Sequence, residues 1–359
     1  MNNPLAQDLE RALRSTAGVW EELREARILV TGGTGFFGGW LLETLLHANA
    51  RLGLDVRATV LTRDAAAFRR RRPHLAGDPA VSLLEGDVLS LEPLDAPFTH
   101  VVHAATAASA RLNAEEPAVM FETIVEGTRR VLEVARRSGA RRLLFTSSGA
   151  VYGRQPAELS HVPEDWPGAP DPLASGSAYG EGKRAAELLC ALGGGAHGYE
   201  AVIARCFAFA GPYLPLDAHF AIGNFVRDAL RGGPIRVQGD GTPFRSYLYG
   251  ADLASWLWTL LARGRGARAY HVGSEAAVSV RELALTVARV LEVGSGVKIA
   301  REAPPGGRAE RYVPSTRRAR EELGLAETFT LEEAIARMAE FARASRSGFP
   351  PPGGDAGAG

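Results

Sequence analysis

Tyr179 and Lys183 stand four residues apart in the stretch SAYGEGKRAAELL, a spacing that places both side chains on one face of a helix. An unperturbed phenol titrates at about pH 10, too high for efficient proton transfer at neutral pH. A neighbouring ammonium favours the phenolate and lowers that pKa. The pair therefore predicts general acid and base chemistry, with Tyr179 as the group that moves the proton.

Two serines supply a second set of reactive groups. Ser147 and Ser148 end the apolar run RRLLFTSS, where a strand end would present a hydroxyl to the reacting oxygen of a substrate. A Tyr-x-x-x-Lys spacing occurs often by chance, and an exposed pair on a helix surface is the alternative interpretation. The conjunction of a glycine loop, strand-end serines and the Tyr–Lys pair in this order is much harder to obtain by chance, so we expect a catalytic cluster.

The glycine-rich loop is TGGTGFFG at 31–38, directly after the apolar run RILV. Gly32, Gly35 and Gly38 satisfy a G-x-x-G-x-x-G spacing, and Gly33 in place of Gly32 satisfies G-x-G-x-x-G. Glycine permits the tight turn and the close backbone contact that a pyrophosphate needs at a helix N-terminus. A tight turn without a ligand is the alternative, but the strand before and the helix after favour a bound dinucleotide.

The end of the second strand bears on which dinucleotide binds. In VLTRDAAAF, Thr62 stands where an acidic residue would hold the ribose hydroxyls of NAD, and Arg63 follows it. An arginine at this position can pair with the 2′-phosphate of NADP. The alternatives are that Arg63 is a solvated charge or that Asp64 acts as the acid from a shifted register. We expect NADP or NAD, with Arg63 favouring NADP, and we expect Asp87 to contact the adenine.

These residues lie within an alternation of strand and helix patterns. Strands are predicted over 27–31, 55–62, 81–88, 100–105, 141–148 and 201–209, with helices between them that include 36–51, 118–137 and 179–192. Continuous apolar strands separated by helices predict an α/β fold, a Rossmann-type doubly wound parallel sheet. The irregular second half of the chain is typical of a smaller substrate lobe over the strand ends.

The same patterns predict how the chain divides. The expected segments are an N-terminal helical extension (1–26), a dinucleotide-binding domain (27–205, with returning segments around 245–275), a mainly substrate-binding lobe (206–345) and a disordered tail (346–359).

Composition and charge exclude several classes of protein. Lys+Arg and Asp+Glu balance at 41 each, so nothing indicates a nucleic acid or a membrane as partner. Cys190 and Cys206 form no metal or redox motif, and His100 and His103, three apart on a strand, face opposite sides and cannot chelate one metal. The N-terminus lacks a signal-peptide core and no apolar run reaches about 18 residues, so a cytoplasmic protein is expected.

From about residue 26 to 345, the chain resembles the extended short-chain dehydrogenase/reductase family, in its nucleotide-sugar epimerase/dehydratase branch. The motifs that carry the resemblance are TGGTGFFG, EGDV, HAAT, TSSGAVYG, YGEGK, GDGTPFRSYLYGADLA and RYVPSTRRAREELG. The resemblance implies Ser148, Tyr179 and Lys183 as the catalytic triad, with Lys183 also binding the nicotinamide ribose.

The resemblance also implies the binding residues. Those expected to contact the cofactor are Gly32, Gly35, Phe36, Phe37, Gly38, Arg63, Asp87, Val88, Ala104, Ala105, Thr106 and Lys183. Those expected to contact a nucleotide-diphosphate sugar are Ser148, Asn224, Arg245 and one of Arg308 or Arg311. Relatives in this branch are commonly homodimers, so a homodimer is expected here.

Four positions depart from the pattern of the branch. Gly149 and Ala150 stand where 4,6-dehydratases carry Asp-Glu, and uronate decarboxylases carry a Glu at the position of Ala150. We therefore expect neither dehydratase nor decarboxylase activity. Ile124 replaces a usual Asn, and Ala208 replaces a substrate-binding Asn, which leaves the details of sugar binding open.

The expected function is hydride transfer at a sugar carbinol or ketone, at C4 by resemblance, and an epimerase is the first expectation. An NADPH-dependent keto-sugar reductase, favoured by Arg63, is the alternative. A non-catalytic dinucleotide-sensing protein on the same fold is a second alternative, but such proteins commonly lose the Tyr–Lys pair that this chain retains.

Overall fold

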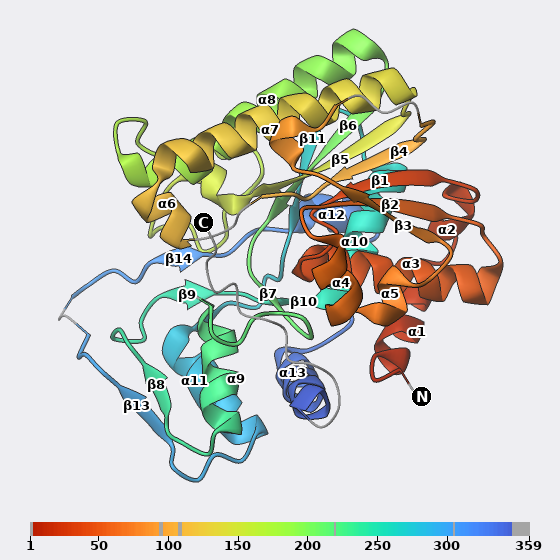
Figure 1. Cartoon of the computed structure of the whole chain (residues 1–359). Coiled ribbons are helices and arrows are strands. Elements are labelled where there is room, and N and C mark those ends of the chain that lie inside the picture. The colour runs from red at the N-terminus through yellow and green to blue at the C-terminus, as the bar shows by residue number, and fades with distance from the viewer. Residues whose placement is uncertain (1–2, 93–95, 107–109, 219, 304–305, 347–359) are drawn as a thin grey trace.

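The computed structural model describes residues 3–92, 96–106, 110–218, 220–303 and 306–346. Its centre is a seven-stranded parallel sheet with the strand order β11-β6-β5-β4-β1-β2-β3 (Figure 1). The strands are β1 (Arg27–Thr31), β2 (Arg57–Thr62), β3 (Val81–Glu85), β4 (His100–His103), β5 (Arg142–Ser148), β6 (Glu200–Cys206) and β11 (Arg268–Val272). The predicted doubly wound α/β fold is confirmed.

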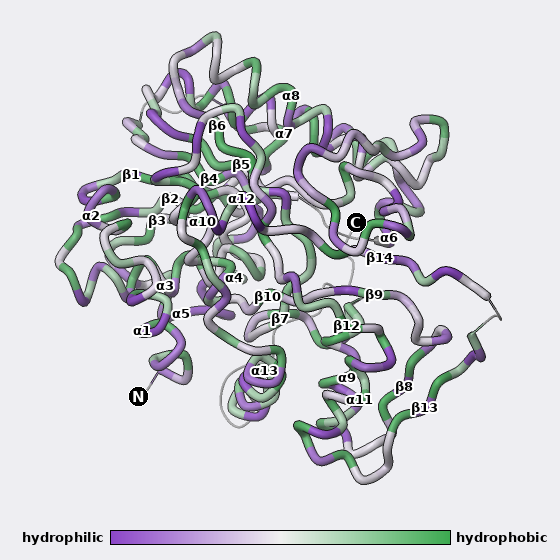
Figure 2. The backbone as a smooth tube through the Cα atoms, turned by 180° about the vertical axis from the view of Figure 1, so that it is seen from behind, coloured by the Kyte–Doolittle hydropathy of each residue, from purple (hydrophilic) through white to green (hydrophobic). Residues whose placement is uncertain are grey.

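The middle of the sheet is buried on both faces, as the continuous apolar runs predict. All four residues of β4 are buried, and in β5 only the first is partly exposed. Figure 2 shows hydrophobic chain along β5 and β6, whereas α7 and α8 alternate between hydrophobic and hydrophilic segments. Such alternation fits helices that cover a sheet with one face and meet solvent with the other.

Helices cover the sheet on both sides (Figure 1). One face carries α7 (Pro117–Ser138) and α8 (Ala178–His197), with the short α6 (Ala110–Glu115) beside them. The other face carries α3 (Phe36–Leu52) and α10 (Gly250–Arg263), and around them lie α1 (Ala6–Ser15), α2 (Val19–Glu22), α4 (Ala65–Arg71), α5 (Pro73–Ala76) and α12 (Arg317–Leu323). Among the described helices, none combines the length and apolar character needed to cross a bilayer.

A smaller second part follows β6 and lies beyond the carboxyl ends of the strands (Figure 1). It contains three small sheets, β7–β10, β12–β9–β14 and β8–β13. Its elements are β7 (Phe209–Ala210), α9 (Ala221–Leu230), β8 (Ile235–Val237), β9 (Phe244–Arg245), β10 (Leu248–Tyr249), β12 (Val278–Ser279), α11 (Val280–Val290), β13 (Val297–Ile299), β14 (Arg311–Tyr312) and α13 (Leu331–Arg346).

Three predicted strands end earlier than expected, and the one predicted over 100–105 ends at His103. The strand predicted over 81–88 ends at Glu85 because the Asp87 carboxylate accepts a hydrogen bond from Leu89 N, 2.8 Å away, and starts the 3-10 turn η1 (Val88–Ser90). The strand predicted over 201–209 ends at Cys206, and β7 resumes at Phe209 in another sheet. Two further 3-10 turns, η2 (Gly149–Tyr152) and η3 (Ser175–Ser177), lie between β5 and α8.

Candidate active site

The structure brings Ser148, Tyr179 and Lys183 together at the carboxyl end of β5. Ser148 is the last residue of that strand, and Tyr179 and Lys183 lie in the first two turns of α8. The Asn113 Oδ1 atom accepts a hydrogen bond from Tyr179 N, 3.0 Å away, because the first amides of a helix have no partner inside it. Asn113 thus anchors the start of α8 beside the strand end.

Lys183 is held by two neutral oxygens. Its Nζ donates to the Thr106 hydroxyl and to the Thr146 carbonyl, each at 2.7 Å, and lies 4.7 Å from the centre of the Phe145 ring. Burial lowers the pKa of Lys183 to about 8. The side chain is therefore fixed in place, and its charge is easily lost above neutral pH.

The pKa of Tyr179 is raised, whereas the sequence predicted that Lys183 would lower it. Burial raises its pKa to about 12, and the hydrogen bond with Ser148 lowers it only in part. The Lys183 ammonium, 5.9 Å from the centre of the Tyr179 ring, does not reverse the effect of burial. In the chain alone Tyr179 is a protonated phenol, so its pKa must fall in a complex before it can act as a base.

Only one of the two strand-end serines faces the cluster. Successive side chains of a strand point to opposite faces, and Ser147 lies below, where its hydroxyl donates to Glu187, 2.5 Å away. Glu187 also forms an ion pair with Arg205 at 2.6 Å. Ser148 therefore remains the serine available to a substrate, and Ser147 belongs to a buried network that braces α8 against β5.

A second phenol, which the sequence did not single out, reaches the same serine. The Tyr312 hydroxyl lies 3.3 Å from Ser148 Oγ, although 164 residues separate the two in the chain. Tyr312 comes from β14, whose partner β9 carries Arg245 directly opposite it. A strand of two residues has no periodic pattern, so the sequence held no signal for this contact.

The glycine loop forms a cradle with free space above one of its members. Gly32 has a φ of +73°, and a Cβ on it would lie 2.7 Å from Ala105 N and closer still to the Ala104 carbonyl. A Cβ on Gly38 would overlap the Gly33 backbone, whereas a Cβ on Gly35 would have its nearest neighbour, Gly32 O, 3.5 Å away. The protein itself thus requires glycine at 32 and 38, while the space over Gly35 is left open at the N-terminus of α3, where a pyrophosphate fits.

The other predicted cofactor residues line the same edge. Phe36 and Phe37 open α3, and Ala104, Ala105 and Thr106 follow β4, with Ala105 N donating to Thr31 Oγ1 at 3.1 Å. Val88 is buried and packs against Gly127, where an added Cβ would lie 3.0 Å from its side chain.

Arg63 and Asp64, which follow β2, differ in their contacts. The Asp64 carboxylate accepts a hydrogen bond from Ala67 N, 2.7 Å away, and caps α4, so it is already engaged. Arg63 is exposed beside it.

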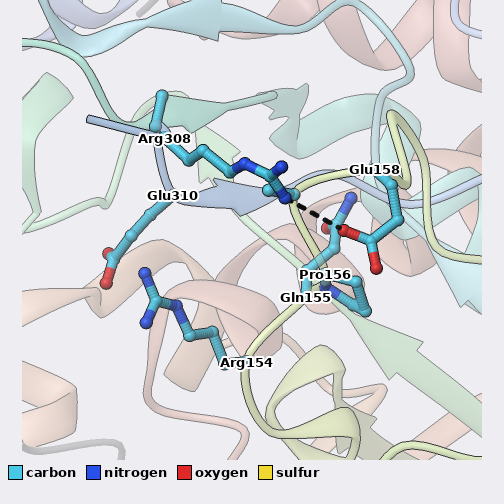
Figure 3. A pocket seen from close by; sticks show the side chains of 8 residues that line it. Arg154, Gln155, Pro156, Glu158, Arg308 and Glu310 are labelled. Atoms are coloured by element: carbon cyan, nitrogen blue, oxygen red, sulfur yellow. Dashed lines mark ion pairs between the residues drawn. The ribbon is translucent and has the colours of Figure 1, made fainter. Parts of the chain in front are cut away.

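Apart from Ser148, the four residues named for substrate binding do not form one group. Arg245 lies 5.9 Å from the centre of the Tyr312 ring, close to the catalytic cluster, and the Arg311 guanidinium lies 4.4 Å from the centre of the Phe244 ring. Arg308 and Arg311 both line a surface pocket with Glu158, which Arg308 faces at 3.9 Å (Figure 3). Asn224 accepts a hydrogen bond from Arg227, 2.9 Å away, within α9. Of the three arginines, Arg245 is the one that the structure places beside Tyr312.

Two further sequence observations find a structural explanation. Ile124, in place of an Asn, is buried against Gly182 of α8, where a Cβ would lie 3.1 Å from its side chain. His103 is buried between two threonines, 2.8 Å from Thr31 Oγ1 and 3.1 Å from Thr128 Oγ1, and burial lowers its pKa to about 3. It is a neutral core histidine, and no group of three or more metal-ligating side chains occurs within the described ranges.

Fold and site together define a Rossmann-type dinucleotide-binding protein with a serine, a tyrosine and a lysine at the strand ends. The family model described as the NAD dependent epimerase/dehydratase family matches residues 28–273. The chain belongs to this family, which confirms the resemblance and makes the protein a member of an NAD-dependent family.

Individual relatives differ in the reaction that their names state. UDP-glucuronic acid decarboxylase 3 of Arabidopsis thaliana is 32% identical over 315 residues, 88% of each chain. The structure of dTDP-glucose 4,6-dehydratase from Streptomyces venezuelae with NAD is 26% identical, with a TM-score of 0.76, and the match covers 90% of this chain and 99% of that one. The UDP-glucose 4-epimerase of Thermus thermophilus with NAD is 28% identical, with a TM-score of 0.73 and coverage of 89% and 99%.

These relatives correct one prediction. The expectation that decarboxylase and dehydratase activities are disfavoured was wrong, because the relatives include a UDP-glucuronic acid decarboxylase and a dTDP-glucose 4,6-dehydratase. The argument considered only Gly149 and Ala150, next to Ser148 in the chain, and the fold brings Tyr312 to Ser148 from far away. Moreover, a carboxylate β to a ketone loses CO₂ by moving electrons into that ketone, so decarboxylation needs no second acid and base beside Ser148.

Proposed function

We propose that this protein oxidises a nucleotide-diphosphate sugar at its C4 hydroxyl, and that UDP-glucuronic acid, which is decarboxylated after this step, is its substrate. The observation that carries the proposal is the cluster of the buried Ser148 and Lys183 with the half-buried Tyr179, at the strand edge next to the glycine loop. The 32% identity to a UDP-glucuronic acid decarboxylase supports the choice of substrate.

The residues present fit NAD. The open space over Gly35 suits the pyrophosphate, and Lys183 stands where it would bind the nicotinamide ribose, as the family resemblance implies. When bound, NAD⁺ supplies a hydride acceptor for the sugar carbon and a positive charge near the phenol. Tyr179 would then have a lower pKa than in the chain alone, because a nearby positive charge favours the phenolate.

The chain's own groups would act on one sugar oxygen. Tyr179 would take the proton of the 4-hydroxyl while Ser148 donates a hydrogen bond to the same oxygen. Once C4 is a ketone, both hydroxyls would donate to its oxygen and draw electrons toward it. The bond from C5 to the carboxylate then breaks, CO₂ leaves, and the electron pair is held as an enolate until C5 takes a proton. When C4 is reduced again, Tyr179 would return its proton to the 4-oxygen, and NAD, which would give back the hydride it accepts from C4, would not be consumed.

The cationic end of the site lies toward the second lobe. Arg245 on β9, together with one of Arg308 or Arg311, would bind the diphosphate as charge-assisted donors. We keep the division proposed from the sequence, with 27–205 binding the dinucleotide and 206–345 mainly binding the sugar nucleotide.

The test is a product analysis with purified protein. UDP-glucuronic acid, UDP-glucose and UDP-galactose are each incubated with the protein and NAD⁺, and CO₂ release and sugar products are measured. We expect CO₂ release from UDP-glucuronic acid that is lost in Tyr179→Phe, which keeps the ring and removes the hydroxyl. Turnover that survives in Tyr179→Phe would refute the role of the tyrosine, and the absence of CO₂ would refute the choice of reaction.

An epimerase is the second candidate. The 28% identity to a UDP-glucose 4-epimerase supports it. Interconversion of UDP-glucose and UDP-galactose without CO₂ release in the same assay would decide for it. Consumption of NADPH with a keto-sugar would instead support the reductase, the activity that Arg63 favours.

We also propose a homodimer. On α7 and α8, Val119, Phe121, Leu188 and Leu192 are exposed, the last two at 61% each. An apolar surface of this kind on adjacent helices suits a second copy of the chain. Light scattering should give twice the mass of one chain, and Leu188→Glu with Leu192→Glu should give a monomer.

A further inference from the structure

Tyr312 is the only residue of the C-terminal segment described here whose side chain is hydrogen-bonded to Ser148. Its ring packs on Phe207, with 4.7 Å between the ring centres, and a Cβ on Gly149 would lie 2.9 Å from its hydroxyl. The Tyr312 ring, which extends from β14, therefore packs between Phe207 and the η2 turn. The phenol is held at the serine by packing and does not reach it as a loose surface side chain.

The hydrogen bonds of Ser148 decide what this contact does. A serine hydroxyl has one proton to donate and two lone pairs. Ser148 Oγ already accepts the Ala150 amide at 3.1 Å, which fills one lone pair. If Tyr312 accepted the serine proton, that proton would be unavailable to a substrate oxygen. If Tyr312 donates, it fills the second lone pair and leaves the serine proton for the side of Tyr179, with which Ser148 also shares a hydrogen bond.

The Tyr312 hydroxyl has one proton and, among the described residues, two acceptors within reach, Ser148 Oγ at 3.3 Å and the Cys206 carbonyl at 3.4 Å. Donation to Ser148 is the case that leaves the serine proton for a substrate oxygen. Burial raises the pKa of Tyr312, so its proton is retained throughout the range in which enzymes work. A hydroxyl that accepts two hydrogen bonds is also a stronger donor, because chains of hydrogen bonds polarise one another.

We propose that Tyr312 is a positioning residue, whose phenol donates to Ser148 and so directs the serine proton toward the reacting oxygen of the sugar. The inference rests on the proposed function in that it assigns Ser148 to the sugar oxygen. It adds that β14, which lies in the second lobe, supplies a residue that the catalytic cluster of the nucleotide-binding domain needs.

The first test is a double-mutant cycle on the full chain. Tyr312→Phe keeps the ring and removes the donor, and we expect kcat to fall about 10-fold with KM within twofold, since deleting a donor that contacts the reacting oxygen directly costs about 10²–10³. In a Ser148→Ala background, Tyr312→Phe should cause no further loss, because Tyr312 acts through the serine. Multiplicative losses in the double variant, or a rise in KM with kcat unchanged, would overturn the proposal.

Tyr199→Phe is the matched control. Tyr199 is also buried, and among the residues that the structure describes none hydrogen-bonds its hydroxyl. Removing that hydroxyl deletes the same atom from a buried tyrosine without touching the site. We expect wild-type kcat and KM for this variant, and a loss equal to that of Tyr312→Phe would show that the cycle reports general destabilisation.

The second test needs no turnover. Neutron structures of wild-type and Tyr312→Phe proteins should differ in the direction of the Ser148 O–H bond, which turns about Cβ–Oγ and is not seen by X-rays at ordinary resolution. An unchanged O–H direction would overturn the positioning role whatever the substrate is. Wild-type protein inactive on all three nucleotide sugars would instead count against the proposed function and leave this structural comparison to decide on Tyr312.

Discussion

Gly32 and Gly35 lie in the same loop, yet alanine at each should cause a different defect. Gly32→Ala should destabilise the fold, because the protein itself fills the space around that position. Gly35→Ala should leave stability nearly unchanged and weaken NAD binding, because the space above it is open to a ligand. The contrast separates the structural from the binding role of the glycine loop.

The cost at Gly32 follows from two effects. A φ of +73° costs a non-glycine residue about 1–2 kcal/mol. The added Cβ at 2.7 Å from Ala105 N, and nearer still to the Ala104 carbonyl, forces the backbone after β4 to shift, and overpacking of this kind costs about 1–3 kcal/mol. Together they remove about 2–5 kcal/mol of a total stability on the order of 5–15 kcal/mol.

The cost at Gly35 is different in kind. Its φ of −82° suits alanine, so the free energy of unfolding should fall by less than about 1 kcal/mol. The methyl group would occupy the position of the pyrophosphate and displace it from the α3 amides. Losing one charge-assisted hydrogen bond of about 1.5–3 kcal/mol weakens NAD binding roughly 10- to 100-fold.

Urea unfolding followed by tryptophan fluorescence and calorimetric titration with NAD⁺ measure the two effects. Gly53→Ala is the control, since Gly53 has a φ of +61° with nothing within 4 Å of an added Cβ, and isolates the backbone penalty. Gly35→Ala protein that binds NAD⁺ as tightly as wild type would refute the assignment of the loop. Gly32→Ala no less stable than Gly53→Ala would refute the overlap argument.

Three further predictions concern buried ionisable side chains. The folded pKa of Lys183, about 8, lies below the usual 10.5, so the native state gains stability as pH rises between them. In urea unfolding, any advantage of Lys183→Met over wild type should shrink over that interval, and a constant gap would contradict the assignment. The folded pKa of His103, about 3, lies below the usual 6.5, so stability that depends on its neutral form is lost as pH falls from 6.5 toward 3. The melting temperature of His103→Gln should therefore fall less steeply with pH than that of wild type, and equal slopes would contradict the assignment. Arg205→Met breaks the ion pair with Glu187 and should lower the free energy of unfolding in urea by about 3–5 kcal/mol. The double variant with Glu187→Leu should recover most of that loss, and a double variant as unstable as the single one would refute the pairing argument.

The sequence predicted the parts of the fold that have strong periodic patterns. β1, at 27–31, has the predicted bounds, and the helix predicted over 118–137 is α7, Pro117–Ser138, since long apolar periods leave little freedom in where an element lies. Ser148, Tyr179 and Lys183 meet because the carboxyl ends of parallel strands share one edge.

What the sequence missed depends on contacts between distant segments. Tyr312 reaches Ser148 through a two-residue strand that no periodic pattern marks. The burial that raises the pKa of Tyr179 comes from the packed surroundings, whereas the sequence revealed only the neighbouring lysine. The prediction against decarboxylase and dehydratase chemistry was wrong for the same reason, because residues adjacent in the chain stood in for the whole site.

The labelling rates of the two cysteines can report local opening of the molecule. Cys190, on α8, and Cys206, at the end of β6, are both buried free thiols. Burial raises the pKa of both thiols, that of Cys206 to about 12. Alkylating reagents attack the thiolate, so each cysteine can be labelled only when its surroundings part. Because Cys190 lies on the buried side of α8 and Cys206 at the end of β6, their separate labelling rates would report the opening of these two regions without any introduced probe.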